Sequence, residues 1–579
     1  MNAPAATKPP RAPLRPIALA LLASLLLTGA IAGCGSSTPP GANADPATVV
    51  PAGAPLYLGA VVRPEGNLKT WSLADARTLT RAHEPFAGLV QTLRSPGGKP
   101  LDYGRDVKPW LGSRAGAFVA SVTSSAGGEL LTHTVSKLLE TIIGSGPGLL
   151  GETGLRELLT STGTQGAIVL DTTDASAAGA FLHARAAEAG AHPVSYRGLS
   201  YELAHDGAAM GLVGEFAVIG TEAALRGVID TKLGGPALVH ASSYATLASS
   251  AEPGALATAY LEAHSLIGDV ASSNGSGTEG LTALVRGLVG PGGPAYISLL
   301  PGHDSLGLDV DTISPTGAPA AGLFADTGGP QAIGSLPGNS WLALGVGDLR
   351  TVLSGGAPEL RILAALPTLL GSGSLNIQGI VKPLTSKAIE PKRDLLSWAG
   401  SGAVFASGSG LLNLEGGIVF SSRSPAGSRA AVALLARAYR AEGAQVSSTS
   451  IPGAEVASTV KVKEFPVALT IAAGNGKLVI GLGPASAQEA LSPTSTFAGS
   501  TYYHEAAATL GQGIQPSAFV SFPTMLALLE GLGLGQGQGT LAQLTPLLHS
   551  LNTLNAGGAE SLAGGVRRAR VVLTLQPTG

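Results

Sequence analysis

Short runs of apolar and small residues alternate with period two along the chain, which is the pattern of half-buried β-strands. In the first half they occupy residues 55–62, 116–122, 166–173, 192–204 and 209–221. Longer segments between them have helical composition, and Asp174 and Thr221 precede two of these as N-caps would. In the second half, Asn475-Gly476 separates two apolar runs, as the turn of a β-hairpin does. Hairpins that alternate with single helices predict an α+β fold of mostly antiparallel sheets with helices packed on them.

The order of these elements repeats in the second half of the chain. Leu56–Gly59 aligns with Leu342–Gly345, and Val218–Gly220 aligns with Val479–Gly481. The matching segments follow the same order in both halves, with a spacing of about 270 residues, which is the size of a domain rather than of a solenoid repeat. We therefore expect two tandem copies of one α+β domain.

The ends of the two copies follow from composition. A stretch rich in Gly, Pro and Ala at residues 313–335 has little periodicity and is expected to be a linker. Copy one is placed at residues 49–312 and copy two at residues 336–579. Residues 1–33 are expected to be a signal peptide and residues 34–48 a flexible tether of small residues and proline.

The N-terminus has the three parts of an export signal. Lys8, Arg11 and Arg15 are its only charged residues, and a 17-residue apolar run follows from Ile17. The run ends in Ile31, Ala32, Gly33 and Cys34, which resemble the lipobox of bacterial lipoprotein precursors. Cleavage before Cys34 would leave its thiol to take a diacylglycerol, and two acyl chains suffice for stable attachment. An uncleaved anchor helix and a plain secretory signal are the alternatives.

Composition narrows the classes of function. Cys34 is the only cysteine, which excludes a disulfide framework and a cysteine-based zinc site. The net charge is −3, and removal of the signal makes it more negative, so nucleic acid is not an expected partner. Only 13% of the residues are charged, about half the roughly 25% of typical soluble proteins. Gly is abundant at 82 residues, and no cofactor-binding motif is present in a convincing context.

One motif, D-x-x-x-W-x-G-S, occurs in both copies. It places Asp106 before Trp110 in copy one and Asp394 before Trp398 in copy two. As a ligand site, each Trp would stack on a sugar or another ring while the Asp accepts hydroxyl donors. As a packing motif, each Asp would cap a helix and each Trp would lie in the core.

Other polar clusters are candidates for chemistry with weaker support. His183, His192 and His205 lie within one predicted helix–hairpin unit, and Tyr502–Glu505 combines two phenols, an imidazole and a carboxylate. The Arg567–Arg570 cluster is expected at a solvated sheet edge, where it would discourage strand pairing.

Two glycine-rich segments match nucleotide or ligand loops only superficially. Gly146–Gly151 has the spacing G-x-G-x-x-G, but Pro147 removes a backbone donor that phosphate binding would use. Residues 531–539, with glycine at every second position, are expected to form a flexible loop.

The lipobox, the opening VPAGAPLYLGAVVRPEG, the D-x-x-x-W-x-G-S segment and FAVIGTEAAL together resemble one family. This is the group of bacterial exported proteins called domain of unknown function 3352. The resemblance implies an envelope lipoprotein and no activity. We expect a protein that is exported and lipid-anchored at the extracytoplasmic face of the cell membrane, and that acts as a non-catalytic binding or scaffolding module. An envelope hydrolase with an unrecognised His/carboxylate site is the alternative.

Overall fold

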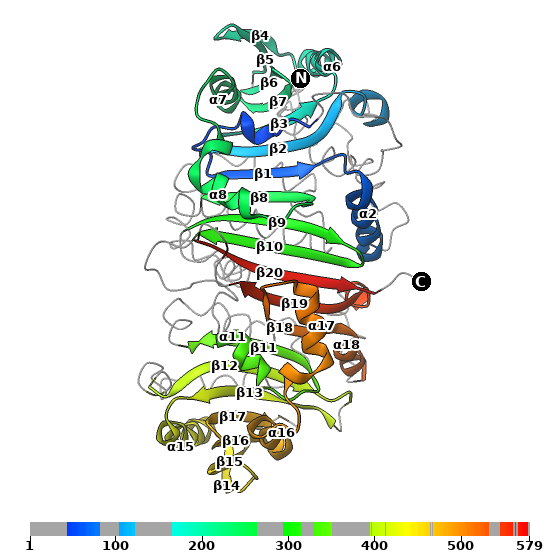
Figure 1. Cartoon of the computed structure of the whole chain (residues 1–579). Coiled ribbons are helices and arrows are strands. Elements are labelled where there is room, and N and C mark those ends of the chain that lie inside the picture. The colour runs from blue at the N-terminus through cyan, green and yellow to red at the C-terminus, as the bar shows by residue number, and fades with distance from the viewer. Residues whose placement is uncertain are drawn as a thin grey trace, which may run out of the picture. The chain divides into compact units, whose positions relative to one another are not determined.

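The computed structural model describes most of the chain outside several long segments. The residues described are 43–80, 103–121, 165–205, 207–262, 293–313, 328–349, 394, 397–410, 413–463, 465, 467–531, 545–559, 562 and 565–576. Their strands pair antiparallel throughout, and helices pack against the sheets, so the α+β class is confirmed (Figure 1). No helix within these residues is long and apolar enough to cross a membrane.

The described residues form two compact units by their internal contacts. Unit 1 contains residues 43–73, 103–121, 165–245 and 256–262, and unit 2 contains residues 74–80, 246–255 and those from 293 onward. This division differs from the one predicted from the repeat, because the strands at residues 294–313 pack within unit 2.

The described part of unit 1 contains eight strands. They are β1 (Leu56–Val61), β2 (Leu111–Ser121), β3 (Gln165–Thr172), β4 (His192–Tyr196), β5 (Leu199–Leu203), β6 (Ala208–Val213), β7 (Phe216–Thr221) and β8 (Ala257–Glu262). Their pairing order is β8-β1-β2-β3-β7-β6-β5-β4. The helical segments are η1 (Pro46–Thr48), α2 (Gly66–Thr80), η2 (Tyr103–Val107), α6 (Ala175–Glu188), α7 (Glu222–Lys232), η3 (Leu238–His240) and α8 (Ser242–Ser250). The later parts of α2 and α8 belong to unit 2.

Unit 2 has a strand order that corresponds to that of unit 1, followed by further strands. Its strands are β9 (Pro294–Gly302), β10 (Ser305–Ile313), β11 (Ser340–Asp348), β12 (Ala399–Ser407), β13 (Glu415–Ser422), β14 (Gln445–Thr449), β15 (Val456–Lys461), β16 (Leu469–Gly474), β17 (Lys477–Leu482), β18 (Gln515–Ser521), β19 (Leu551–Ala559) and β20 (Val566–Leu575). The order β18-β11-β12-β13-β17-β16-β15-β14 corresponds strand by strand to that of unit 1. Beyond β18 the sheet continues as β19-β20-β10-β9.

Several helices of unit 2 fall at the same places in the strand order as helices of unit 1. They are α11 (Gly328–Gly334), α15 (Pro425–Ala441), α16 (Gly483–Leu491), η8 (Phe497–Gly499), α17 (Thr501–Leu510) and α18 (Phe522–Gly531). In both units one helix separates the third strand from the following hairpin, and a second helix follows the last hairpin strand. The two positions are held by α6 and α7 in unit 1 and by α15 and α16 in unit 2.

Local sequence explains several element boundaries. The Asp174 carboxylate accepts the Ala177 amide at 2.9 Å, and Thr221 caps α7, so both predicted N-caps are confirmed. Asn475 and Gly476 both have positive φ, at 49° and 69°, and join β16 to β17 as predicted. Positive φ at both central residues gives a hairpin turn whose twist matches that of its strands.

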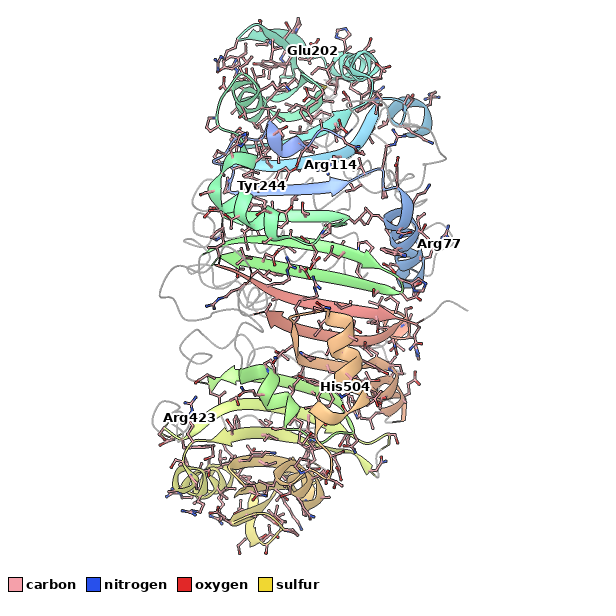
Figure 2. The ribbon with its side chains drawn as sticks, in the orientation of Figure 1. Arg77, Arg114, Glu202, Tyr244, Arg423 and His504 are labelled. Atoms are coloured by element: carbon pink, nitrogen blue, oxygen red, sulfur yellow. The ribbon has the colours of Figure 1, made fainter. Side chains whose placement is uncertain are left out.

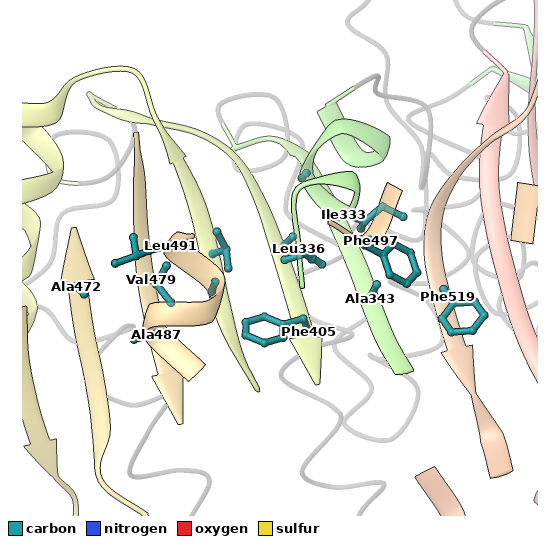
Figure 3. Close-up of a cluster of buried hydrophobic side chains, with 14 of the residues drawn as sticks. Ile333, Leu336, Ala343, Phe405, Ala472, Val479, Ala487, Leu491, Phe497 and Phe519 are labelled. Atoms are coloured by element: carbon teal, nitrogen blue, oxygen red, sulfur yellow. The ribbon is translucent and has the colours of Figure 1, made fainter. Parts of the chain in front are cut away.

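In the core of unit 2, glycine allows a helix to pack closely against the sheet. Ile333, Phe405, Phe497 and Phe519, from α11, β12, η8 and β18, gather with smaller residues in one buried cluster (Figure 3). A Cβ on Gly345 of β11 would lie 2.4 Å from the carbonyl oxygen of a glycine in α11. Glycine in the strand therefore lets the helix backbone lie directly on the sheet.

Candidate functional site

The lipobox lies outside the described residues; it consists of Ile31, Ala32, Gly33 and Cys34. The two glycine-rich segments also lie outside them, except for the first residue of the 531–539 run; the other segment is Gly146–Gly151. Lipidation of Cys34 therefore stays a prediction. The first described residue is Asn43, nine residues after Cys34.

The two tryptophans of the D-x-x-x-W-x-G-S motif are buried. Trp110 and Trp398 are each 2% exposed. The Trp110 indole N–H donates to the carbonyl oxygen of Asp106 at 2.8 Å, and that of Trp398 donates to the carbonyl oxygen of Asp394 at 2.7 Å. The predicted ligand contact by Asp106, Trp110, Asp394 and Trp398 is wrong for the rings, because neither ring offers a face for stacking. Packing in the core, the alternative interpretation, is confirmed for both tryptophans.

The Gly-Ser pair that ends the motif holds a side chain from the neighbouring strand. In unit 1 the Ser113 amide donates to Oδ2 of Asp171, at the end of β3, at 3.1 Å. A Cβ on Gly112 would lie 2.1 Å from the same oxygen, so only glycine leaves room for the carboxylate. We call Trp110–Arg114 together with Asp171 the first corner.

Unit 2 has the same arrangement with a neutral partner. The Ser401 amide donates to Oγ of Ser421 at 2.8 Å, and a Cβ on Gly400 would lie 2.4 Å from that oxygen. The strand register shifts at this point in both units, between Leu111 and Ala115 and between Ala399 and Gly402. We call Trp398–Gly402 together with Ser421 the second corner. The motif is therefore a bulged strand start that receives a polar side chain.

The first corner also contacts the residues at which the described chain begins. The Ser113 hydroxyl bonds to Oδ1 of Asn43, and an Arg114 guanidinium nitrogen lies 3.4 Å from a carboxylate oxygen of Asp45 (Figure 2). Asp171 is fully buried, and burial raises the pKa of its carboxyl, while the amides of Ser113 and Ala44 act to lower it.

The three histidines predicted to converge, His183, His192 and His205, do not meet at one point. Nδ1 of His183 on α6 lies 2.9 Å from Oε1 of Glu202 on β5, and the His183 side chain is 75% exposed (Figure 2). The rings of His192 and His205 face each other with centroids 6.1 Å apart. Within the described part of the chain, no group of three His, Cys, Asp or Glu residues is placed to hold a metal ion.

The Tyr502–Glu505 segment divides between core and surface. It forms the start of α17, where Tyr502 stacks on Phe519 and Tyr503 packs edge-on against Phe497. His504 (Figure 2) and Glu505 are exposed, so the four side chains do not form one polar site.

The arginine cluster of the last strand is buried rather than solvated. Arg568 and Arg570 lie within β20, directly opposite Asp311 and Asp309 of β10. Arg568 donates to both oxygens of Asp311 at 2.8 Å, and Arg570 donates to Oδ1 of Asp309 at 2.6 Å. The predicted solvated edge is wrong, because β20 pairs on both sides and Arg568 and Arg570 are neutralised across the strand pair. We call these four residues the Asp/Arg ladder.

The ladder is completed by neighbouring groups of unit 2. Glu252 lies 2.9 Å from Arg568 and 3.2 Å from Arg570, and the carbonyl oxygens of Ser250 and Leu510 accept from the two guanidiniums. Both aspartates are 1% exposed. The pKa of Asp311 is raised, chiefly by burial, although the Arg568 guanidinium acts to lower it.

A further buried acid lies apart from the ladder. Asp75 on α2 is 3% exposed, and neither of its carboxyl oxygens has a hydrogen-bond partner of normal geometry among the described residues. Burial, reinforced by the nearby Asp304 carboxylate, raises its pKa to about 8. Asp75 therefore carries a proton at neutral pH.

Comparison with known proteins places the chain in a family. The family described as "Protein of unknown function (DUF3352)" matches residues 17–575. The chain belongs to this family. No curated protein matches it. Among solved structures, crystal forms I and III of TP0453 are similar over 48% of this chain and 82–83% of theirs, at 9–10% identity and a TM-score of 0.24.

The Asp/Arg ladder was not predicted from the sequence, although the sequence contains a pattern that indicates it. The closing strand of each half carries like charges at period two, D-x-D at Asp309 and Asp311 and R-x-R at Arg568 and Arg570. Period two places each pair on one face of its strand, and the opposite signs favour the pairing of one strand with the other. Asp75 and Asp171 gave no such signal, since a single acid in an apolar segment is not distinctive.

Proposed function

We propose that this DUF3352 protein is a lipid-anchored envelope protein that acts without catalysis, as a binding or scaffolding module at the extracytoplasmic face. The observation that carries the proposal is the position of Cys34. The only cysteine of the chain directly follows Ile31-Ala32-Gly33, at the end of an apolar run preceded by basic residues. A diacyl anchor at that point would hold the protein at the membrane.

We further propose that the body of the protein consists of two copies of one domain. Eight strands pair in the same order in each unit. The support extends to single hydrogen bonds, because Trp110 and Trp398 donate to corresponding carbonyls and Ser113 and Ser401 donate to corresponding side chains.

A scaffolding role is supported by how the matched polar residues are used. The side chains repeated between the copies bond within the fold, at the first and second corners, rather than to one another in an open site. The Asp/Arg ladder joins β10 to β20, which are the closing strands of the two sequence repeats. Such bonding holds a large sheet in one register and leaves its outer surface to meet a partner.

The alternative is an envelope hydrolase, for which the contact between His183 and Glu202 is the supporting observation. A His/carboxylate pair is a common part of general acid–base sites. This pair is largely exposed, with His183 at 75%, whereas catalytic pairs are usually enclosed in a pocket. A hydrolase of this kind would lose activity in a His183→Gln variant.

The anchor is tested by expressing the full-length chain in a bacterial host with radiolabelled palmitate. The wild-type chain is expected to take up label and to sediment with membranes. Cys34→Ala is expected to lose the label, and the matched variant Ser36→Ala is expected to keep it. Label that persists in Cys34→Ala would overturn the proposal.

A further inference from the structure

The chain is built into the core of unit 1 from Ala47 onward, thirteen positions after the proposed anchor at Cys34. Ala47, Val49 and Val50 are at most 1% exposed, so this segment is built into the core. The Ala52 amide bonds to the Pro236 carbonyl at 2.9 Å, and the Leu238 amide bonds to the Val50 carbonyl at 2.8 Å. The segment is thus fixed to unit 1 by packing and by backbone hydrogen bonds.

The first corner extends this attachment toward the N-terminus. Ser113 binds the Asn43 side chain, Arg114 lies beside Asp45, and the buried Asp171 faces the Ala44 amide. Asp45 also caps η1 by accepting the Ala47 amide at 3.0 Å. The point at which the chain leaves unit 1 therefore lies at the first corner, where β2 begins and β3 ends.

The second corner lacks the groups that hold this segment. Ser421 replaces Asp171, and Gly402 stands where Arg114 would align. Ser421 has its own partner in Ser401, with which it shares hydrogen bonds within unit 2. The charged groups of the first corner thus coincide with the place where the N-terminal segment enters.

The length of the tether limits how far the first corner can lie from the anchored residue. Asn43 lies nine positions after Cys34 in the sequence. A flexible chain of that length has an end-to-end distance of roughly 17 Å, and its fully extended reach is roughly 30 Å. By comparison, β2 extends about 26 Å from Ser113 to Ser121 at about 3.3 Å per residue.

We propose that the docking of Asn43–Asp45 on the first corner makes this end of the unit 1 sheet the face that lies against the membrane. This rests on the lipid anchor proposed above. The average end-to-end distance of the tether is shorter than the length of β2. The first corner therefore stays near the bilayer, and the opposite ends of β2 and β3 lie farther out. The partner of this face is the surface of a lipid bilayer.

Two exposed serines mark the two ends of the sheet. Ser176, in the first turn of α6, follows directly after β3 at the first corner, and Ser121 ends β2 at the opposite end. Both are exposed, and a cysteine at either is the only free thiol once Cys34 is lipidated. Ser176→Cys and Ser121→Cys are therefore a matched pair for labelling.

The lipidated full-length variants, labelled with a donor dye, are reconstituted in phosphatidylcholine vesicles with acceptor dye on the lipid headgroups. Energy transfer is expected to be greater at position 176 than at position 121. Insertion of twenty Gly/Ser residues after Ala42 raises the average tether length to roughly 30 Å, which exceeds the length of β2. This insertion is expected to abolish the difference between the two positions.

Each outcome bears on a distinct claim. Equal transfer at the two positions, or greater transfer at position 121, in protein that remains bound to the vesicles would overturn the orientation and leave the anchor standing. Full-length protein that fails to bind vesicles and carries no lipid would overturn the anchor itself. A difference that survives the insertion would show that the docked tether is not its cause.

Discussion

Arg568 is a residue at which one substitution should greatly lower the stability of the fold. Its side chain is 5% exposed, and its guanidinium bonds to both oxygens of Asp311, to Glu252 and to the Ser250 carbonyl. Arg568→Met keeps much of the apolar stem and removes every one of these bonds. Asp311, itself 1% exposed, is then left buried without its cation.

The expected cost follows from that uncompensated carboxylate. Removing one member of a buried ion pair typically destabilises a protein by about 3–5 kcal/mol. Arg568→Met should therefore lower the free energy of unfolding by about that amount at pH 7. The cost should shrink as the pH falls, because a buried carboxyl without its cation gains a proton more readily.

The assay is urea unfolding of the full chain at pH 7 and pH 4, followed by tryptophan fluorescence. Arg429→Met is the matched control in the same unit, since Arg429 pairs with Glu455 at a site where both side chains are about half exposed. Exposed pairs contribute about 0–1 kcal/mol.

The double variant Asp311→Leu, Arg568→Met should recover much of the loss, because apolar residues often replace a buried pair at little cost. A loss below about 1 kcal/mol for Arg568→Met, or none recovered in the double variant, would refute the reasoning.

Two further predictions concern the other buried acids. Asp75 should bind a proton in the folded chain up to about pH 8, whereas its unfolded pKa is 3.8, so stability should fall between those values as the pH rises. Asp75→Asn should unfold at higher urea than the wild type at pH 8 and at similar urea at pH 4, and parallel pH profiles would contradict this. Gly112→Ala should lower the thermal midpoint, at a cost of about 1–3 kcal/mol, because its Cβ would meet the Asp171 carboxylate. Gly53→Ala, whose Cβ would meet nothing within 4 Å, is the control in calorimetry and should leave the midpoint nearly unchanged.

The high glycine content of the chain has a structural role in both units. In unit 1 a Cβ on Gly220 of β7 would lie 2.4 Å from the carbonyl oxygen of Gly166 on β3. In unit 2 a Cβ on Gly481 of β17 would lie 2.8 Å from the Ala487 amide of α16. Glycines thus permit close backbone contact in both units, in places where an alanine would force a shift.

Much of the local structure could be predicted from the sequence, because it depends on interactions between residues close together in the chain. Period-two patterns located the strands, and Asp174 and Thr221 located the starts of two helices, because capping depends only on residues a few positions apart. Asn475-Gly476 located a hairpin turn for the same reason, since positive φ at both positions restricts which residues can occupy it. The lipobox is likewise a linear motif, read from adjacent residues.

The roles of the polar side chains depended on the tertiary structure. The sequence alone left Trp110 and Trp398 open to two interpretations, because burial is a property of what packs around a residue. It placed Arg568 at a solvated edge, because nothing local indicates that a strand more than 250 residues away supplies Asp311 as its partner. Local patterns determined the elements of this protein, whereas only long-range pairing decided which charges are buried, which are neutralised, and where the N-terminal segment is held.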